Sequence, residues 1–263
     1  MRRKKLSWRF LHPVASLLVG PYRSFFKGEG IEFADARPYE PGDDWRRIHW
    51  SLTARKNQPY LRLGQEEREL TCILAIDRSP SMNLHPAKQE LTWEAAMLLA
   101  LSAWINGDRV RWLSFTNQIE YFSPAQKGES FIWAYLDILR TQVPRGRYSL
   151  LSPLLQWVLH TQKKRSLLIV LSDMFFHEEP WNLLQAVAMK HFVLMVNIHM
   201  PEEQRVPHWG YVPLREVEKK HSFILAPHLT PSNSPQPRVR WAYLQPGQPI
   251  LPALHRALSL PLV

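Results

Sequence analysis

The chain has 263 residues, 45% of them hydrophobic, which is enough for one large domain, or a domain with extensions, around a sizeable core. Its single cysteine, Cys72, excludes a disulfide framework and fits a reducing compartment. The apolar stretch near the start, Pro13 to Gly20, is too short to span a bilayer, and no convincing cleavage site follows it. We therefore predict a cytoplasmic protein of bacterial type.

The net charge of +10 is concentrated at the two ends of the chain. Residues 1–28 carry seven Lys or Arg and no acid, and residues 219–263 carry five and no acid. The 21 basic and 23 acidic residues of 29–218 nearly cancel. Basic ends favour contact with an acidic surface, such as a membrane leaflet, a nucleic acid or an acidic partner. Solvated tails are an equally good interpretation.

Residues 1–28 form a basic N-terminal segment in which Lys and Arg are mixed with aromatic residues. The pattern predicts a short amphipathic helix from Leu6 to Val19, interrupted at Pro13. Residues 29–69 are dense in charge and contain a Pro41-Gly42 pair that suits the centre of a type II turn. We expect them to form an extended, charged arm with turns rather than a packed domain.

From Leu70 to residue 226, apolar runs of strand length alternate with helical patterns. The predicted strands are Leu70–Ile76, Arg109–Phe115, Gln118–Phe122, Ser166–Leu171 and Phe192–His199, the second and third forming a hairpin. The predicted helices are Leu91–Ile105, Glu129–Leu139, Pro153–Thr161 and Trp181–Lys190. This alternation predicts an α/β domain with a doubly wound, mainly parallel sheet and helices on both faces.

The composition changes again after residue 226. Seven of the 26 residues from 227 to 252 are proline. We interpret residues 227–263 as a Pro-rich basic tail, that is, a linker or arm outside the core.

The first predicted strand ends in Asp77-Arg78-Ser79-Pro80-Ser81. In an extended segment alternate side chains point the same way, so Asp77, Ser79 and Ser81 are expected to converge above the strand end. Asp173 follows another strand, and in an open α/β sheet the carboxyl ends of the strands form the ligand-binding edge. Hard oxygen donors of this kind suit Mg²⁺ or Mn²⁺. A polar turn and a helix cap are the alternative interpretations.

The segment from Glu32 to Trp50 alternates acids, arginines and aromatic residues. Exposed ion pairs contribute only about 0–1 kcal/mol each, so such a run is better explained by recognition or docking than by stability. Docking onto the main domain and recognition of a partner remain equal alternatives. Trp45, Ile48 and Trp50 are the expected apolar anchors in both cases.

Other chemistries find no support in the sequence. It has no phosphate-binding glycine loop, no zinc-ligand spacing among its 11 histidines and no Gly-x-Ser-x-Gly elbow. Ser79 as a nucleophile would need a base that the sequence does not offer. We therefore expect a protein that is not an enzyme.

These motifs together resemble a known family. The residues of the arm that match its signature include Glu32, Arg37, Tyr39, Asp43, Asp44, Arg46, Ile48, Trp50 and Arg55. We assign these residues, together with Trp45, to partner binding or arm docking. The Asp-x-Ser-x-Ser-Met run at 77–82 follows in the expected order. The chain is similar to the bacterial family catalogued as domain of unknown function fifty-eight, whose core resembles the von Willebrand factor A domain.

The resemblance implies a metal-ion-dependent adhesion site, in which a carboxylate of the partner completes the coordination of the cation. Its ligands here would be Asp77, Ser79, Ser81 and Asp173. It also implies a working partner, an AAA+ ATPase of the MoxR type, in chaperone-like maturation or a stress response.

Two positions depart from the family pattern. Tyr148 stands where a threonine is expected in the second metal loop, and its side chain is too long for that role. Ser149 would replace the threonine if the loop shifts by one residue, and a water is the alternative. In that case metal binding would be weak or absent. Where the family signature has an aspartate before the tryptophan, this chain has His49 before Trp50.

The leading hypothesis is thus a protein-interaction module that binds its partner through a divalent cation and the 32–55 signature. The runner-up is a basic adaptor that contacts an anionic membrane surface through its termini, nucleic acid being the less expected ligand. A metal-dependent hydrolase is the third interpretation.

Overall fold

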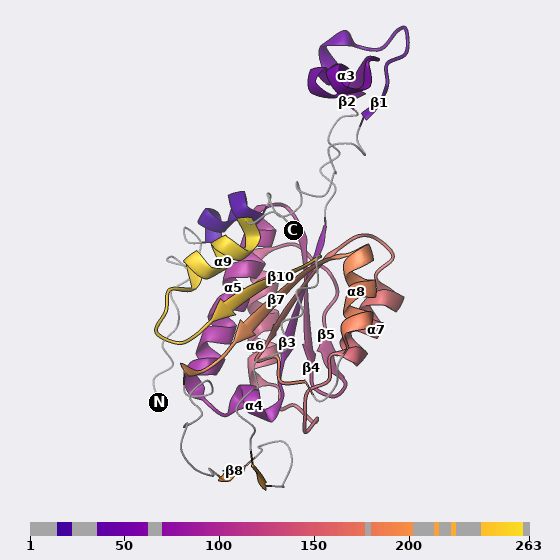
Figure 1. Cartoon of the computed structure of the whole chain (residues 1–263). Helices are drawn as coiled ribbons and strands as arrows, with labels where there is room; N and C mark the ends of the chain where they lie inside the picture. The colour runs from indigo at the N-terminus through magenta and orange to yellow at the C-terminus, as the bar shows by residue number, and fades with distance from the viewer. Residues whose placement is uncertain are drawn as a thin grey trace.

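The computed structural model describes residues 15–22, 36–62, 70–176, 180–201, 213–215, 222–224 and 238–259. Its centre is a six-stranded sheet of order β10-β7-β6-β3-β4-β5 (Figure 1). The strands are β3 (Thr71–Asp77), β4 (Arg109–Phe115), β5 (Ile119–Phe122), β6 (Leu167–Ser172), β7 (Phe192–Ile198) and β10 (Val239–Leu244). All neighbours are parallel except β4 and β5, which form the predicted antiparallel hairpin.

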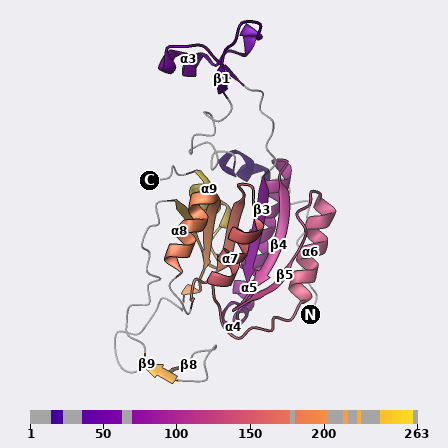
Figure 2. The same ribbon diagram turned by 90° about the vertical axis from the view of Figure 1, so that its right-hand side faces the viewer.

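Helices cover both faces of this sheet, as the alternating pattern predicted (Figure 2). Along β3, Cys72, Leu74 and Ile76 face one apolar cluster, whereas Ile73 and Ala75 face the other. The first cluster is completed by α5 (Pro86–Ile105), α6 (Glu129–Thr141), α9 (Ile250–Ser259) and residues 15–22. The second is completed by α7 (Ser152–Thr161) and α8 (Trp181–Lys190). Since both faces are buried, β3, β6 and β7 are continuous apolar runs.

The predicted helices and strands of 70–200 are all present, with bounds that differ by a few residues. The largest difference is in α5, which begins at Pro86 rather than at Leu91. Proline is favoured in the first turn of a helix, which explains the earlier start. A one-turn helix, α4 (Pro80–Asn83), was not predicted. These two helices lie in the chain directly after Asp77, the residue at the carboxyl end of β3.

The prediction that residues 227–263 lie outside the core is wrong for the described part of that segment. Strand β10 pairs in parallel with β7 along its whole length, from Val239↔Val193 to Leu244↔Ile198. Helix α9 then packs back onto the sheet and buries Leu254 and Leu258 completely. The error arose because prolines 246, 249 and 252 flank or begin α9, where proline is tolerated, and do not mark a continuous linker.

The amphipathic helix predicted for Leu6–Val19 is described from residue 15 and extends to residue 22. Its buried side chains, Ala15, Leu18 and Tyr22, belong to the core, and Ser102 of α5 donates a hydrogen bond to the Ala15 carbonyl at 3.1 Å. This face of the helix is therefore occupied by the domain itself and is not free to enter a membrane surface.

Residues 36–62 form a small folded unit, so the prediction of an extended arm is corrected here too. Strands β1 (Ala36–Pro38) and β2 (Tyr60–Arg62) pair antiparallel, and η1 (Trp45–Arg47) and α3 (Trp50–Lys56) lie between them in the chain. Leu52 and Leu61 are its buried apolar side chains. Gly42 has φ +111° and the Asp43 amide donates to the Glu40 carbonyl, which is the hydrogen-bonded turn expected around Pro41-Gly42.

A second short antiparallel pair, β8 (Pro213–Arg215) with β9 (Ser222–Ile224), was not predicted. None of the helices within the described residues combines the length and the apolar character needed to cross a bilayer.

Candidate functional site

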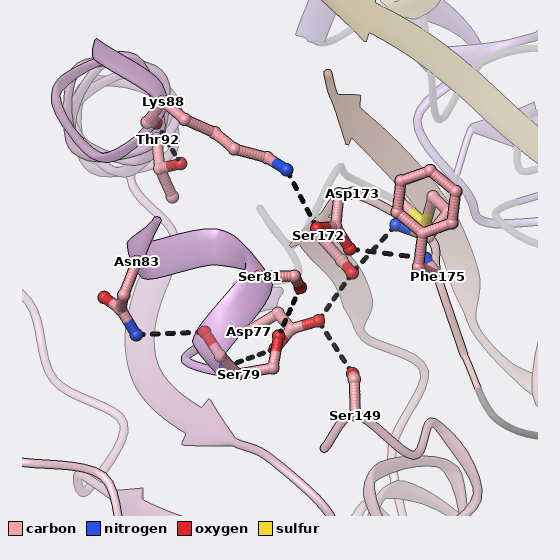
Figure 3. A network of polar contacts seen from close by, with 11 residues as sticks. Asp77, Ser79, Ser81, Asn83, Lys88, Thr92, Ser149, Ser172, Asp173 and Phe175 are labelled. Carbon is pink, nitrogen blue, oxygen red and sulfur yellow. Dashed lines mark hydrogen bonds and ion pairs between the residues drawn. The ribbon is translucent and has the colours of Figure 1, made fainter. Parts of the chain in front are cut away.

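Asp77 is the last residue of the central strand β3 and is only 1% exposed. Its carboxylate accepts three hydrogen bonds (Figure 3). Oδ1 accepts from the Ser79 amide at 2.8 Å, and Oδ2 accepts from Ser149 Oγ at 2.7 Å and Ser172 Oγ at 2.6 Å. Residues from three separate segments therefore meet at one carboxylate.

Ser79 and Ser81 lie beside Asp77, as predicted, but for a different reason. The segment is not extended, because α4 begins at Pro80 with Ser79 as its N-terminal flanking residue. The helical turn brings the two hydroxyl oxygens to 3.1 Å. Asn83 closes the loop by donating to the carbonyls of Arg78 and Ser79, both at 3.0 Å.

Asp173 reaches the same edge from the end of β6, as expected for parallel strands. Its Oδ2 accepts from Lys88 Nζ at 2.8 Å, and both side chains are fully buried. Its Oδ1 accepts from the Phe175 amide at 3.3 Å. Lys88 was not among the predicted site residues, because its position within the first turn of α5 was not foreseen.

Ser149, rather than Tyr148, occupies the loop position that faces Asp77. Ser149 is fully buried, whereas Tyr148 is 38% exposed. The one-residue shift considered from the sequence therefore brings a hydroxyl of suitable length to the site. Ser172 was missed as a site residue, although it directly precedes Asp173; the next residue but one, Met174, has φ +62° and donates its amide to Ser172 Oγ at 3.0 Å.

The electrostatics of Asp77 follow from this enclosure. Burial, and then the neighbouring charge of Asp173, raise the pKa of Asp77 from 3.8 to about 6, while the hydrogen bonds from Ser172, Ser79 and Ser149 oppose that rise. The site thus holds two close carboxylates and balances part of their charge with the Lys88 ammonium.

Arg78 anchors the loop from the other side. Its guanidinium donates to the carbonyls of Leu139 and Gln142 at the end of α6, the second of these at 3.1 Å, and lies 5.2 Å from the Trp93 ring. A cation at a helix C-terminus is favourable, so this contact fixes the loop to α6 and α5.

The carboxylate oxygens that a divalent cation would use already accept hydrogen bonds in this arrangement of side chains. Both oxygens of Asp173 already accept hydrogen bonds, one of them from a buried ammonium, and both oxygens of Asp77 accept from amide or hydroxyl donors. The described residues contain no group of three His, Cys, Asp or Glu side chains that could hold a metal ion, whereas the predicted ligand set consists of two aspartates and three serines. Metal binding by Asp77, Ser79, Ser81, Ser149 and Asp173 stays a prediction.

The signature residues of 36–62 mostly organise their own unit. Arg37 Nη2 pairs with Asp43 Oδ1 at 2.5 Å, and Asp43 Oδ2 accepts from the Glu40 amide at 3.0 Å. Asp44 caps η1 by accepting from the Arg46 amide at 3.0 Å. His49 caps α3 through Nδ1, which accepts from the Leu52 amide at 3.3 Å. An imidazole therefore takes the capping role that a carboxylate would fill equally well.

Other residues of the unit that we assigned to partner binding or docking are exposed or half-buried. Trp45 and Trp50 are 63% and 67% exposed, and the Arg46 guanidinium lies 5.8 Å from the Trp45 ring. Arg55 is exposed, while Tyr39 and Ile48 are half-buried. Glu32 lies outside the described residues. Whether this unit docks onto the domain or recognises a partner remains a prediction.

The fold and the loop at Asp77 together define the class of protein domain to which this chain belongs. A doubly wound sheet with an Asp-x-Ser-x-Ser loop at the end of its central strand is a von Willebrand factor A-like domain. The family profile described as "Protein of unknown function DUF58" matches residues 35–232. The chain belongs to this family.

The chain is also similar to curated proteins of mycobacteria. Rv1480 of Mycobacterium tuberculosis, an uncharacterized protein, is 28% identical over 207 residues, which are 77% of this chain and 65% of that relative. The chain therefore spans about two thirds of the length of its curated relatives.

Two Bacteroides structures are similar at 12% identity and cover 72% of the chain. One is the conserved hypothetical protein BatB of B. thetaiotaomicron, of which the match covers 97%, with a TM-score of 0.48. The other is an aerotolerance-related membrane protein of B. fragilis, of which the match covers 98%, with a TM-score of 0.49.

Proposed function

We propose that this chain is a non-enzymatic protein-interaction module that contacts its partner at the carboxyl edge of the sheet. The observation that carries this proposal is the combination of a rigid polar cluster with exposed apolar neighbours. Tyr148, Phe175 and Leu84 are 38%, 38% and 53% exposed. Each lies within a few residues of Ser149, Asp173 or Ser81. Apolar and aromatic anchors around fixed polar groups are typical of interface hot spots.

The hydrogen bonding of Ser79 supports a binding role rather than catalysis. A nucleophilic serine needs a base at hydrogen-bond distance from its hydroxyl. Ser79 Oγ instead lies beside another hydroxyl, Ser81 Oγ. Asp77 Oδ1 accepts a hydrogen bond from the backbone amide of Ser79, not from its hydroxyl. This arrangement gives the loop a fixed shape without activating Ser79.

The unit of residues 36–62 offers a second contact. Its exposed Trp45 and Trp50 stand among charged side chains, and Trp and Arg are the residues that most often dominate binding energy at interfaces. The internal pairs of Arg37 and Asp43 hold the unit's own turn. The two tryptophans are therefore the residues we assign to recognition.

The class of partner comes from the family resemblance. We propose an AAA+ ATPase of the MoxR type, with which the chain would act in the cytoplasm in chaperone-like maturation or a stress response. The resemblance also implies a carboxylate-bearing surface on the partner, which would meet the half-buried Ser81 hydroxyl, because Ser79 is fully buried. The buried thiol of Cys72 is compatible with a reducing compartment.

The test is co-purification of the full chain with a co-expressed MoxR-type ATPase from its native cell. We expect Phe175→Ala and the double variant Trp45→Ala/Trp50→Ala each to lower the recovered ATPase at least tenfold. The matched control is Met189→Ala. Met189 is 58% exposed but lies near the end of α8, beside the start of β7 and thus at the opposite edge of the sheet.

Equal recovery of the ATPase by Met189→Ala and the two test variants would count against the assigned surfaces. If no variant and not even the wild-type chain retains the ATPase, the proposed partner is wrong.

A further inference from the structure

We propose that Lys88 is the resident cation of this site. Its ammonium pairs with the Asp173 carboxylate and offsets part of the negative charge that Asp77 and Asp173 carry together, so the cluster is assembled without a divalent metal. This inference concerns the isolated protein and does not rest on the proposed partner. It predicts a von Willebrand factor A-like edge that functions independently of metal.

The position of Lys88 is the first argument. Lysine is almost never fully buried unless it is paired, and the first turn of a helix disfavours cations because the N-terminal amides carry partial positive charge. Lys88 is nonetheless in the first turn of α5 and its side chain is fully buried. Local helix preference therefore does not explain a lysine here, whereas the 2.8 Å ion pair with Asp173 does.

The direction of the side chain is the second argument. Figure 3 shows Lys88 reaching from α5 toward Asp173, with the Asp77, Ser79, Ser81 and Ser149 group on the far side of that carboxylate. An ion shared by Asp77 and Asp173 would bring a second positive charge close to this ammonium. At such short range and in a buried setting the repulsion is strong. The ammonium and a metal therefore compete for the same carboxylates.

The hydrogen bonding of Asp77 is the third argument. Burying a carboxylate without a partner is unfavourable in free energy, and in a metal site the ion supplies the stabilising charge. Here the backbone amide of Ser79 and the hydroxyls of Ser149 and Ser172 stabilise the Asp77 carboxylate by hydrogen bonds instead. With Lys88 on Asp173, each carboxylate has its own donors, so the site is complete as the chain folds.

The experiment follows Mn²⁺ binding to the full chain by thermal unfolding and by the electron paramagnetic resonance signal of free Mn²⁺. We expect wild type to show no change in either signal at millimolar Mn²⁺. Lys88→Arg, which keeps the positive charge, should behave in the same way. Lys88→Met, of similar length but neutral, should unfold at a temperature that rises with Mn²⁺. Adding Asp77→Asn to Lys88→Met should abolish that rise.

Two results would overturn the assignment. One is Mn²⁺ binding by the wild-type chain that is lost in Asp77→Asn. The other is a folded Lys88→Met protein that still ignores Mn²⁺, because the ammonium would then not be what excludes the ion.

If Lys88→Met does not fold, the ¹⁵N signal of the Lys88 ammonium in wild type decides the question. This signal is identified by its loss in Lys88→Arg. We expect it to persist when paramagnetic Mn²⁺ is added. Broadening by Mn²⁺ that Asp77→Asn prevents would place the ion beside Lys88 and overturn the proposal.

Discussion

Ser172 makes two hydrogen bonds at the end of β6, and both depend on its hydroxyl. It donates to Asp77 Oδ2 at 2.6 Å and accepts from the Met174 amide at 3.0 Å. Ser172→Ala would leave the buried carboxylate with one donor fewer and remove the acceptor of an amide at positive φ. We expect a loss of about 1–3 kcal/mol in the free energy of unfolding, measured by urea denaturation.

The control for this change is Ser130→Ala, an exposed residue of α6. Its effect should stay within about 0.5 kcal/mol, because surface substitutions away from special features are nearly neutral. Equal effects of the two substitutions would contradict the role assigned to Ser172.

His191 gives the protein a pH dependence of its own. Its Nδ1 lies 3.0 Å from Ser166 Oγ, and its buried Nε2 has no hydrogen-bond partner within the part of the chain that the structure describes. Burial, with smaller contributions from the charges of Lys190 and Arg165, lowers the pKa of His191 below its ordinary 6.5. The folded protein thus binds a proton at this site less readily than the unfolded chain does.

The sign of the effect follows from this difference. The contribution of His191 to stability is fully present above about pH 6.5 and is lost as the pH falls through the folded-state pKa. We expect His191→Gln to flatten the decline of stability between about pH 7 and pH 5, as measured by urea unfolding across that range. A decline as steep as that of wild type would show that other groups cause it.

At the scale of elements, β10 and α9 are the most informative pair. Neither was predicted, because the proline content of residues 227–252 indicated a linker. A strand needs only a short run of apolar residues, here Val239–Leu244, and a pattern of prolines on either side does not forbid it. The central strands were predictable because both faces of the sheet are covered and their sequences are continuously apolar. The start of α5 was not, because the residues before Leu91 are largely polar.

We expect Leu254→Ala in α9 to lower the free energy of unfolding by about 2–5 kcal/mol, since Leu254 is fully buried and its loss leaves a cavity. Urea unfolding provides the measurement. His255→Ala changes the exposed neighbour on the same helix and should cost about 0.5 kcal/mol or less. A neutral Leu254→Ala would mean that α9 does not belong to the core.

At the scale of the whole molecule, two N-terminal pieces have different relations to the α/β domain. Residues 15–22 contribute buried side chains to its core, whereas the strand pairing and caps of residues 36–62 lie within their own unit. Distance along the chain therefore does not indicate which N-terminal segment contributes to the core. Residues 36–62 are closer to the domain in sequence, yet residues 15–22 are the ones that supply buried side chains to the core.

This difference predicts the outcome of two deletions. Replacing residues 36–62 by a flexible Gly/Ser linker should leave the thermal unfolding temperature of the domain within a few degrees, whereas deleting residues 1–22 should lower it clearly or prevent folding. The reason is that only the second deletion exposes apolar core surface, at about 25 cal/mol per Å². Calorimetry of both proteins tests this, and the reverse order of stabilities would refute it.

The sequence by itself determined the α/β alternation, the strand that ends in Asp77 and the sharing of one edge by Asp77 and Asp173. These follow from local patterns and from the rule that parallel strands end together. Only the tertiary structure decided that Lys88 from α5 pairs with Asp173, and that Ser149 and Ser172 supply donors to Asp77. A lysine has no fixed meaning in a sequence, because its role depends on which buried carboxylate lies within reach of its ammonium.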